Sequence, residues 1–300
     1  RGKELYHLYK VAIECSSKVM YPEYLSLTGE KGIVSEVYKK YKKVISPMCC
    51  RAFLTKWFER GGESPADDYD TPVFIGRFNI GVVSLNLPMI LSKSRENNDD
   101  FYKVLDYYLE QIREIHKSTY KFLAEKKAYT NPLAFMQGGL YGGYLNRDDK
   151  IEPLLKSATA SYGITALNEL QYLYNGKSII EDGKFALEVA GYINNKVAEY
   201  QSEDHIQYSV YGTPAESLCG KQVKSFRDKF GVLENVSDRD YFSNSFHCHV
   251  SEDITQIEKQ SYEARFWDLF NGGKIQYIRV DVPYNIEALE AYVTNAMELG

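Results

Sequence analysis

Apolar residues recur along much of the chain with the 3.6-residue period of an amphipathic helix. Within residues 99–127, for example, Leu105, Tyr108, Leu109 and Ile112 fall on one stripe. Such a stripe predicts a long helix with one buried side. The same pattern predicts helices over residues 3–20, 33–44, 99–127, 164–174, 181–203, 213–230, 257–270 and 286–297.

Shorter runs rich in Val, Ile, Leu and Tyr predict strands. The run over residues 75–87 is almost continuously apolar after Ile80, which is typical of a strand covered on both faces. From residue 157 onward the predicted strands alternate with helices, and this alternation predicts an α/β fold. The predicted strands cover residues 51–58, 75–87, 157–163, 206–211 and 274–282.

A glycine-rich segment, P-L-A-F-M-Q-G-G-L-Y-G-G-Y, lies within residues 131–146. Four glycines in so short a stretch disfavour a stable helix and predict close backbone approach. No Lys-Ser or Lys-Thr pair follows them, so the segment is not a phosphate-binding P-loop. Residues 241–250 have no regular period and are predicted to be irregular or extended.

The composition excludes several function classes. The formal net charge is −5, which gives no electrostatic reason to expect a nucleic-acid partner. No apolar run of 18 residues is present, so we expect no membrane span. Five cysteines without regular spacing do not resemble a secreted disulfide framework, and a reducing cytoplasm is the expected setting.

The two ends of the chain predict an internal segment of a longer polypeptide, or one half of a split protein. Residue 1 is Arg, and Gly300 follows directly after an amphipathic pattern. No linker long enough to separate domains is visible, so we expect residues 1–300 to form one segment.

Two adjacent cysteines, Cys49 and Cys50, follow Pro47 and precede a strand-like run. Three interpretations stay open from the residues alone. The pair is structurally incidental, it forms a vicinal disulfide, or one thiol is reactive. Cys15 lies within a predicted helix, where we expect a small buried residue.

Asn79 is a polar residue in an otherwise strand-like segment. A strand amide that faces a core must be hydrogen-bonded, since an unpaired one costs roughly 1–3 kcal/mol. The side chain is therefore either a satisfied core amide or a donor to substrate hydroxyls or a small carboxylate.

The heptapeptide Y-G-T-P-A-E-S covers residues 211–217. Thr213 as N-cap, Pro214 at the first helical position and Glu216 at the third predict a capping box. A helix N-terminus that follows a strand also offers free N–H groups to an anion such as a triphosphate.

His247, Cys248 and His249 have the side chains of metal ligands. On a strand the two histidines would share a face. Without a second Cys or His cluster at ligand spacing, the sequence does not predict a metal site.

Four motifs in order carry a resemblance that covers nearly the whole chain. They are M-C-C-R-A-F-L at residues 48–54, G-R-F-N-I-G-V-V-S-L-N-L-P at 76–88, A-T-A-S-Y-G-I-T-A-L-N-E-L at 158–170, and Y-G-T-P-A-E-S. As a set they resemble the anaerobic, glycyl-radical ribonucleoside-triphosphate reductases. The resemblance implies an incomplete α/β barrel of the glycyl-radical type, with the cysteine loop directed to its centre.

The resemblance also implies roles for individual residues. Cys50, directly before an arginine, matches the thiyl-radical position, while Cys49 stands where most relatives have Gly and is a possible redox partner. Asn79 in the R-x-N-x-G context marks the branch that uses formate as reductant. Tyr211 and Glu216 match residues near the substrate.

Cofactors and partners follow from the same resemblance. The radical glycine and the zinc-binding cysteines of the family are expected beyond residue 300. We therefore expect no metal site within residues 1–300. Expected partners are ribonucleoside triphosphates, formate, an iron–sulfur, S-adenosylmethionine activase and a second copy in a homodimer. The alternatives are another glycyl-radical enzyme, of the formate-lyase type, or a non-catalytic scaffold that lacks the radical glycine.

Overall fold

The computed structural model describes residues 5–48, 51–280, 282 and 284–300, and it divides into two compact units. The larger unit contains residues 47–250 and 269–274. The smaller unit contains residues 1–46, 251–268 and 275–300. Within the described residues, no helix has both the length and the apolar character that a membrane crossing needs.

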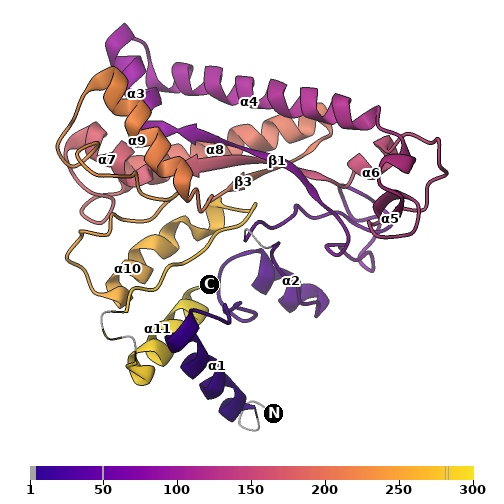
Figure 1. The fold of residues 1–300 in the computed structure, drawn as a ribbon, viewed down its shortest axis with the longest axis horizontal. Helices are drawn as coiled ribbons and strands as arrows, with labels where there is room; N and C mark the ends of the chain where they lie inside the picture. The colour runs from indigo at the N-terminus through magenta and orange to yellow at the C-terminus, as the bar shows by residue number, and fades with distance from the viewer. Residues whose placement is uncertain (1–4, 49–50, 281, 283) are drawn as a thin grey trace. The chain divides into compact units, whose positions relative to one another are not determined.

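A three-stranded parallel sheet, in the order β1-β2-β3, forms the centre of the larger unit (Figure 1). Parallel neighbours need long crossovers, and helices supply both of them here. The sequence prediction of α/β alternation is confirmed over this region. The strands are β1 (Asn79–Asn86), β2 (Thr159–Thr165) and β3 (Gln207–Tyr211).

Two long helices, α4 (Phe101–Ala124) and α8 (Lys184–Asp204), cover one face of this sheet (Figure 1). The ring of His116 on α4 packs against Tyr162 of β2 and Tyr208 of β3. Tyr162 also packs against a tyrosine of α8. Strand positions that alternate with these rings face the other way.

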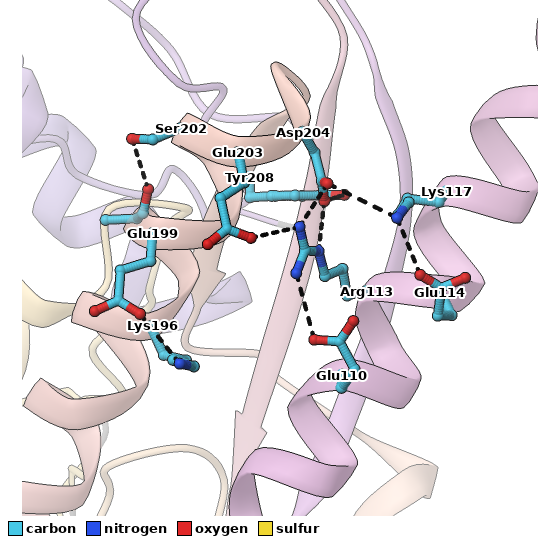
Figure 2. A network of polar contacts seen from close by, with 11 residues as sticks. Glu110, Arg113, Glu114, Lys117, Lys196, Glu199, Ser202, Glu203, Asp204 and Tyr208 are labelled. Atoms are coloured by element: carbon cyan, nitrogen blue, oxygen red, sulfur yellow. Dashed lines mark hydrogen bonds and ion pairs between the residues drawn. The ribbon is translucent and has the colours of Figure 1, made fainter.

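An ion network ties α4 to α8 and β3 (Figure 2). The Arg113 guanidinium donates two hydrogen bonds to Asp204, at 2.7 and 2.6 Å, and one to Glu203 at 2.8 Å. The Tyr208 hydroxyl donates to Asp204 at 3.1 Å. The side chains of Arg113 and Asp204 are only 13% and 9% exposed, so this bidentate pair is partly desolvated.

The remaining helices of the larger unit surround the ends of the sheet. Helix α3 begins directly where β1 ends, with the Asn86 side chain accepting from the Met89 amide and Pro88 in the first turn. The sequence pattern did not predict this helix. The set is α3 (Leu87–Asn97), η1 (Ala128–Thr130), α5 (Pro132–Phe135), α6 (Glu152–Leu155), α7 (Leu167–Asn175) and α9 (Ser217–Phe230).

The smaller unit is largely helical. Ile13, Leu289 and Val293 form its buried centre. The prediction of a buried Cys15 is wrong, because Ile13 takes the inward side of its helix and Cys15, two positions on, is exposed. The helices are α1 (Tyr6–Val19), α2 (Ile33–Tyr41), α10 (Gln256–Glu263), η2 (Ala264–Leu269) and α11 (Ile286–Leu299).

Two predicted strands, over residues 51–58 and 274–282, are wrong within the part of the chain that the structure describes. The first makes only isolated bridges, at Ala52 and Phe58, because its backbone partners are scattered over several segments. In the second, residues 274–280 have no regular secondary structure. The backbone contacts β3 just before them instead, where the Gly272 amide donates to the Val210 carbonyl at 2.8 Å.

The glycine-rich segment approaches other backbone closely, as predicted. A Cβ on Gly139 would lie 2.5 Å from the Leu133 carbonyl oxygen, and one on Gly143 would lie 2.2 Å from that of Ala134. Both contacts are with the one-turn helix α5, which lies inside the segment predicted to be non-helical. The glycines therefore serve packing.

Candidate functional site

The face of the sheet opposite α4 and α8 carries mostly polar side chains, and we call it the polar face. Its members follow from the strand register and from the alternation of side chains. None of them carries a charge at neutral pH. They are Asn79, Val82, Ser84 and Asn86 of β1, Thr159, Ser161, Gly163 and Thr165 of β2, and Gln207, Ser209 and Tyr211 of β3.

A ladder of three side chains crosses the polar face, with one member on each strand. Asn79 Nδ2 donates to Ser161 Oγ at 2.6 Å, and Ser161 Oγ lies 2.9 Å from Ser209 Oγ. Asn79 Oδ1 accepts from the Gly81 amide at 2.8 Å. A carboxamide has two N–H groups and two carbonyl lone pairs, so one of each remains for a ligand.

Residues 51–58 follow the paired cysteines, and we call them the Thr55 segment. This segment contacts the polar face. The Thr55 amide donates to Thr159 Oγ1 at 3.2 Å, and the two threonine hydroxyls lie 3.1 Å apart. Thr159 is the register partner of Asn79. This brings residues shortly downstream of the cysteines to the strand ends where Asn79 lies.

Backbone hydrogen bonds join Met48 to Arg51 and Ala52, the described residues on either side of the paired cysteines. The Arg51 amide donates to the Met48 carbonyl at 2.7 Å, and the Met48 amide donates to the Ala52 carbonyl at 2.9 Å. Cys49 and Cys50 lie outside the described residues. Their predicted roles therefore stay predictions.

Arg77 links three backbone segments beside the polar face, a role that the sequence pattern did not indicate. Its buried guanidinium donates to the carbonyls of Thr55, Ser157 and Val73 at 2.6–2.8 Å. Burial lowers the pKa of Arg77 to about 10, so the group is still cationic at neutral pH. It joins the Thr55 segment to the residue stretch that leads into β2.

Tyr211 and Glu216 lie at the carboxyl end of β3, but they differ in burial. Tyr211 is buried and Glu216 is exposed. The predicted capping box is wrong, because Ala215 and Glu216 have φ values of 59° and 36°, and the helix begins only at Ser217. This left-handed backbone at two non-glycine residues is strained.

A second polar cluster lies at the carboxyl end of β2. Glu169 Oε1 accepts from the Ser243 amide at 3.2 Å and its hydroxyl at 2.8 Å, and complete burial raises the pKa of this carboxyl. Cys219 Sγ lies 3.1 Å from Asn244 Oδ1. Burial raises the pKa of the Cys219 thiol to about 12, so it is not a thiolate at neutral pH.

His247, Cys248 and His249 are buried in an irregular segment, as the sequence predicted for residues 241–250. The two histidines therefore do not share a strand face. Across the described ranges, no group of three or more His, Cys, Asp or Glu side chains is arranged to hold a metal ion.

Residues 1–299 match the protein family described as anaerobic ribonucleoside-triphosphate reductase. The chain is 32% identical over 297 residues to the anaerobic ribonucleoside-triphosphate reductase of Haemophilus influenzae, and 31% identical over 297 residues to that of Escherichia coli. Each alignment covers 97% of this chain and 40% of the relative. For the enzyme of phage T4 the identity is 32%, with 95% and 45% covered. The chain thus spans less than half the length of these relatives.

Solved structures share the fold. An anaerobic ribonucleotide reductase superposes with a TM-score of 0.58 at 18% identity, over 75% of this chain and 36% of that one. The Thermotoga maritima enzyme with dATP bound in its specificity site gives 0.56 at 16% identity, over 75% and 39%. The fold similarity and the sequence matches agree, and the chain belongs to the anaerobic ribonucleoside-triphosphate reductase family.

Proposed function

We propose that this chain forms the catalytic core of an anaerobic ribonucleoside-triphosphate reductase, which converts ribonucleoside triphosphates to 2′-deoxyribonucleoside triphosphates. The proposal rests on the polar face: three parallel strands, with α4 and α8 on one side and neutral hydrogen-bonding groups on the other. A water-poor site for radical chemistry and a small carboxylate needs such neutral donors.

The proposed architecture is an incomplete α/β barrel of the glycyl-radical type, formed by residues 1–300 as one catalytic segment. The polar face would line its interior, and the cysteine loop would be directed to its centre. Two observations support this arrangement. Helices α4 and α8 cover only the opposite face, and the Thr55 segment contacts the polar face at Thr159.

The reaction assigned to this site begins at Cys50. A glycyl radical, on a glycine expected beyond residue 300, would accept the hydrogen atom of the Cys50 thiol. The Cys50 sulfur then takes the ribose 3′ hydrogen, and the 2′ hydroxyl leaves as water. Formate supplies two electrons and is oxidised to CO2, so that NTP + HCOO⁻ + H⁺ gives dNTP + CO2 + H2O. This chain orients the reactants and excludes competing reactions.

Individual residues take the following proposed roles. Asn79 offers its remaining N–H to formate or to a ribose hydroxyl. Tyr211 forms part of the substrate wall at the end of β3, and Glu216 lies at the rim. Cys49 is a redox partner only if a dithiol rather than formate is the reductant.

The proposal extends to partners by family membership. We expect an iron–sulfur, S-adenosylmethionine activase to generate the radical, a homodimer, a cytoplasmic setting, and zinc only in a region beyond residue 300. No nucleic acid or membrane partner is proposed.

The test is Cys50→Ser in the full-length protein, activated without oxygen. We expect turnover of ribonucleoside triphosphates to be abolished, because a hydroxyl O–H is far harder than a thiol to convert to a radical, while calorimetry shows unchanged nucleotide binding. Retained turnover would contradict the proposal. Turnover of acyl substrates instead of nucleotides would indicate the formate-lyase type, and no nucleotide binding would indicate a scaffold.

A further inference from the structure

The hydrogen bonds at the Asn79 end of the ladder have a defined direction. The Gly81 amide can only donate, so Asn79 must turn its carbonyl oxygen toward it, at 2.8 Å. The amide nitrogen of Asn79 then faces Ser161 and donates to its hydroxyl at 2.6 Å. Since Ser161 Oγ already accepts this bond, its own proton is available for Ser209 Oγ, 2.9 Å away.

The two serines are held firmly. Both are fully buried, so water cannot take over their hydrogen bonds. His116 Nε2 lies 3.1 Å from the Ser161 carbonyl oxygen and fixes the strand at that residue from the other face. Gly272 packs closely against Ser209, since a Cβ at this glycine would lie 2.5 Å from the Ser209 hydroxyl oxygen.

We propose that Ser161 and Ser209 are positioning residues for Asn79. They lock its carboxamide so that the second N–H and the second carbonyl lone pair face the ligand on the polar face. The ligand group is a small carboxylate, and this inference rests on the function proposed above. Ser161 acts directly on Asn79, and Ser209 acts through Ser161.

The experiment compares Ser161→Ala, Ser209→Ala and a control, Ser94→Ala, in the full-length protein. Ser94 is also buried, and its hydroxyl donates to the Leu91 carbonyl within α3, away from the polar face. The probe is ¹³C-labelled formate, whose Kd is measured by NMR without radical activation and with nucleotide bound. Hydrogen–deuterium exchange of the Gly81 amide reports carboxamide rotation, which a general loss of stability would not single out.

We expect Ser161→Ala to raise the formate Kd about tenfold and to speed exchange at Gly81, since losing one fixed hydrogen bond costs about 1–1.5 kcal/mol. Ser209→Ala should raise the Kd about two- to threefold, and Ser94→Ala should leave it unchanged. Nucleotide binding should be preserved in all three variants.

A formate Kd in Ser161→Ala equal to that of Ser94→Ala, with Asn79→Asp still impaired, would overturn the positioning role and leave the proposed function intact. If the unmutated protein binds nucleotide but not formate, the proposed reductant and this inference both fail.

Discussion

The two faces of the three-stranded sheet stabilise their buried polar groups in different ways. On the side of α4 and α8, charges are paired: Arg113 holds Asp204 in a bidentate ion pair beside Tyr208 (Figure 2). On the polar face the groups are neutral amides and hydroxyls, linked by single hydrogen bonds such as that between Asn79 and Ser161. Alternate residues of the same strands therefore serve two environments.

The two faces indicate where this fold places charged side chains. The Arg113 network lies between elements that are held together permanently, where an ion pair with full hydrogen bonding is tolerated. A ligand-binding face must release its partner, and a fixed charge there would repel formate or bind it too rigidly. Neutral donors avoid both problems, so we infer that the charged side maintains the structure and the neutral side binds the ligand.

A charge placed on the polar face should impair the reaction most strongly. Asn79→Asp keeps the size of the side chain, removes both N–H donors and adds a negative charge beside Ser161. We expect formate-dependent turnover to fall about a hundredfold or more, as for the loss of a preorganised donor in an active site, with nucleotide binding changed little. Product formation with formate as sole reductant and calorimetry with nucleotide measure the two quantities. Unchanged formate-dependent turnover would remove Asn79 from the site.

Removing the charge from the other side should affect stability instead. Arg113→Met leaves Asp204, whose side chain is 9% exposed, without its bidentate partner, and we expect a loss of about 3 kcal/mol in the free energy of unfolding. Lys196→Ala is the control, because its partner Glu199 is 59% exposed and such pairs contribute less than about 1 kcal/mol. Chemical denaturation measures both. An altered formate Kd in Arg113→Met, or equal stability losses in the two variants, would contradict the division of roles.

A smaller effect is expected from pH, through His116 between the sheet and α4. Burial lowers the pKa of His116 from 6.5 to about 4, so the unfolded chain binds its proton more readily than the folded protein. Stability is therefore lost as the pH falls from about 6.5 toward 4, by about 2 kcal/mol between pH 7 and pH 5. His116→Phe should show a shallower loss over this window in denaturation curves. Parallel pH dependence in both proteins would show that His116 is not responsible.

Local sequence patterns were sufficient for the central sheet and its long helices. The period-two run T-A-S-Y-G at 159–163 places Thr159 and Ser161 on one side and Tyr162 on the other. Ile164 and Thr165, predicted to begin the next helix, belong to the end of this strand instead. Helix α3 was missed although its signals, an Asn N-cap and a proline in the first turn, were present. These signals follow directly on β1, and the apolar residues of the strand continue into the helix. The boundary between strand and helix was therefore not visible in the hydrophobic pattern.

The rest depended on partners distant in sequence. The ladder requires Ser161 to meet Asn79 and Ser209, which are 82 and 48 residues away and aligned only by strand register. Residues 51–58 alternate like a strand, but among the described residues they form only isolated bridges, at Ala52 and Phe58, and no ladder with another strand. The capping box failed because two residues before α9 take left-handed backbone angles, which no local motif indicated.

Labelled formate can show whether the neutral polar face serves formate-dependent reduction, as we claim. Full-length activated protein should release one ¹³CO2 from ¹³C-formate for each deoxyribonucleotide formed, and Cys50→Ser should release none. Deoxyribonucleotide formed with a dithiol system and without ¹³CO2 would contradict the claim and would indicate Cys49 as the redox partner.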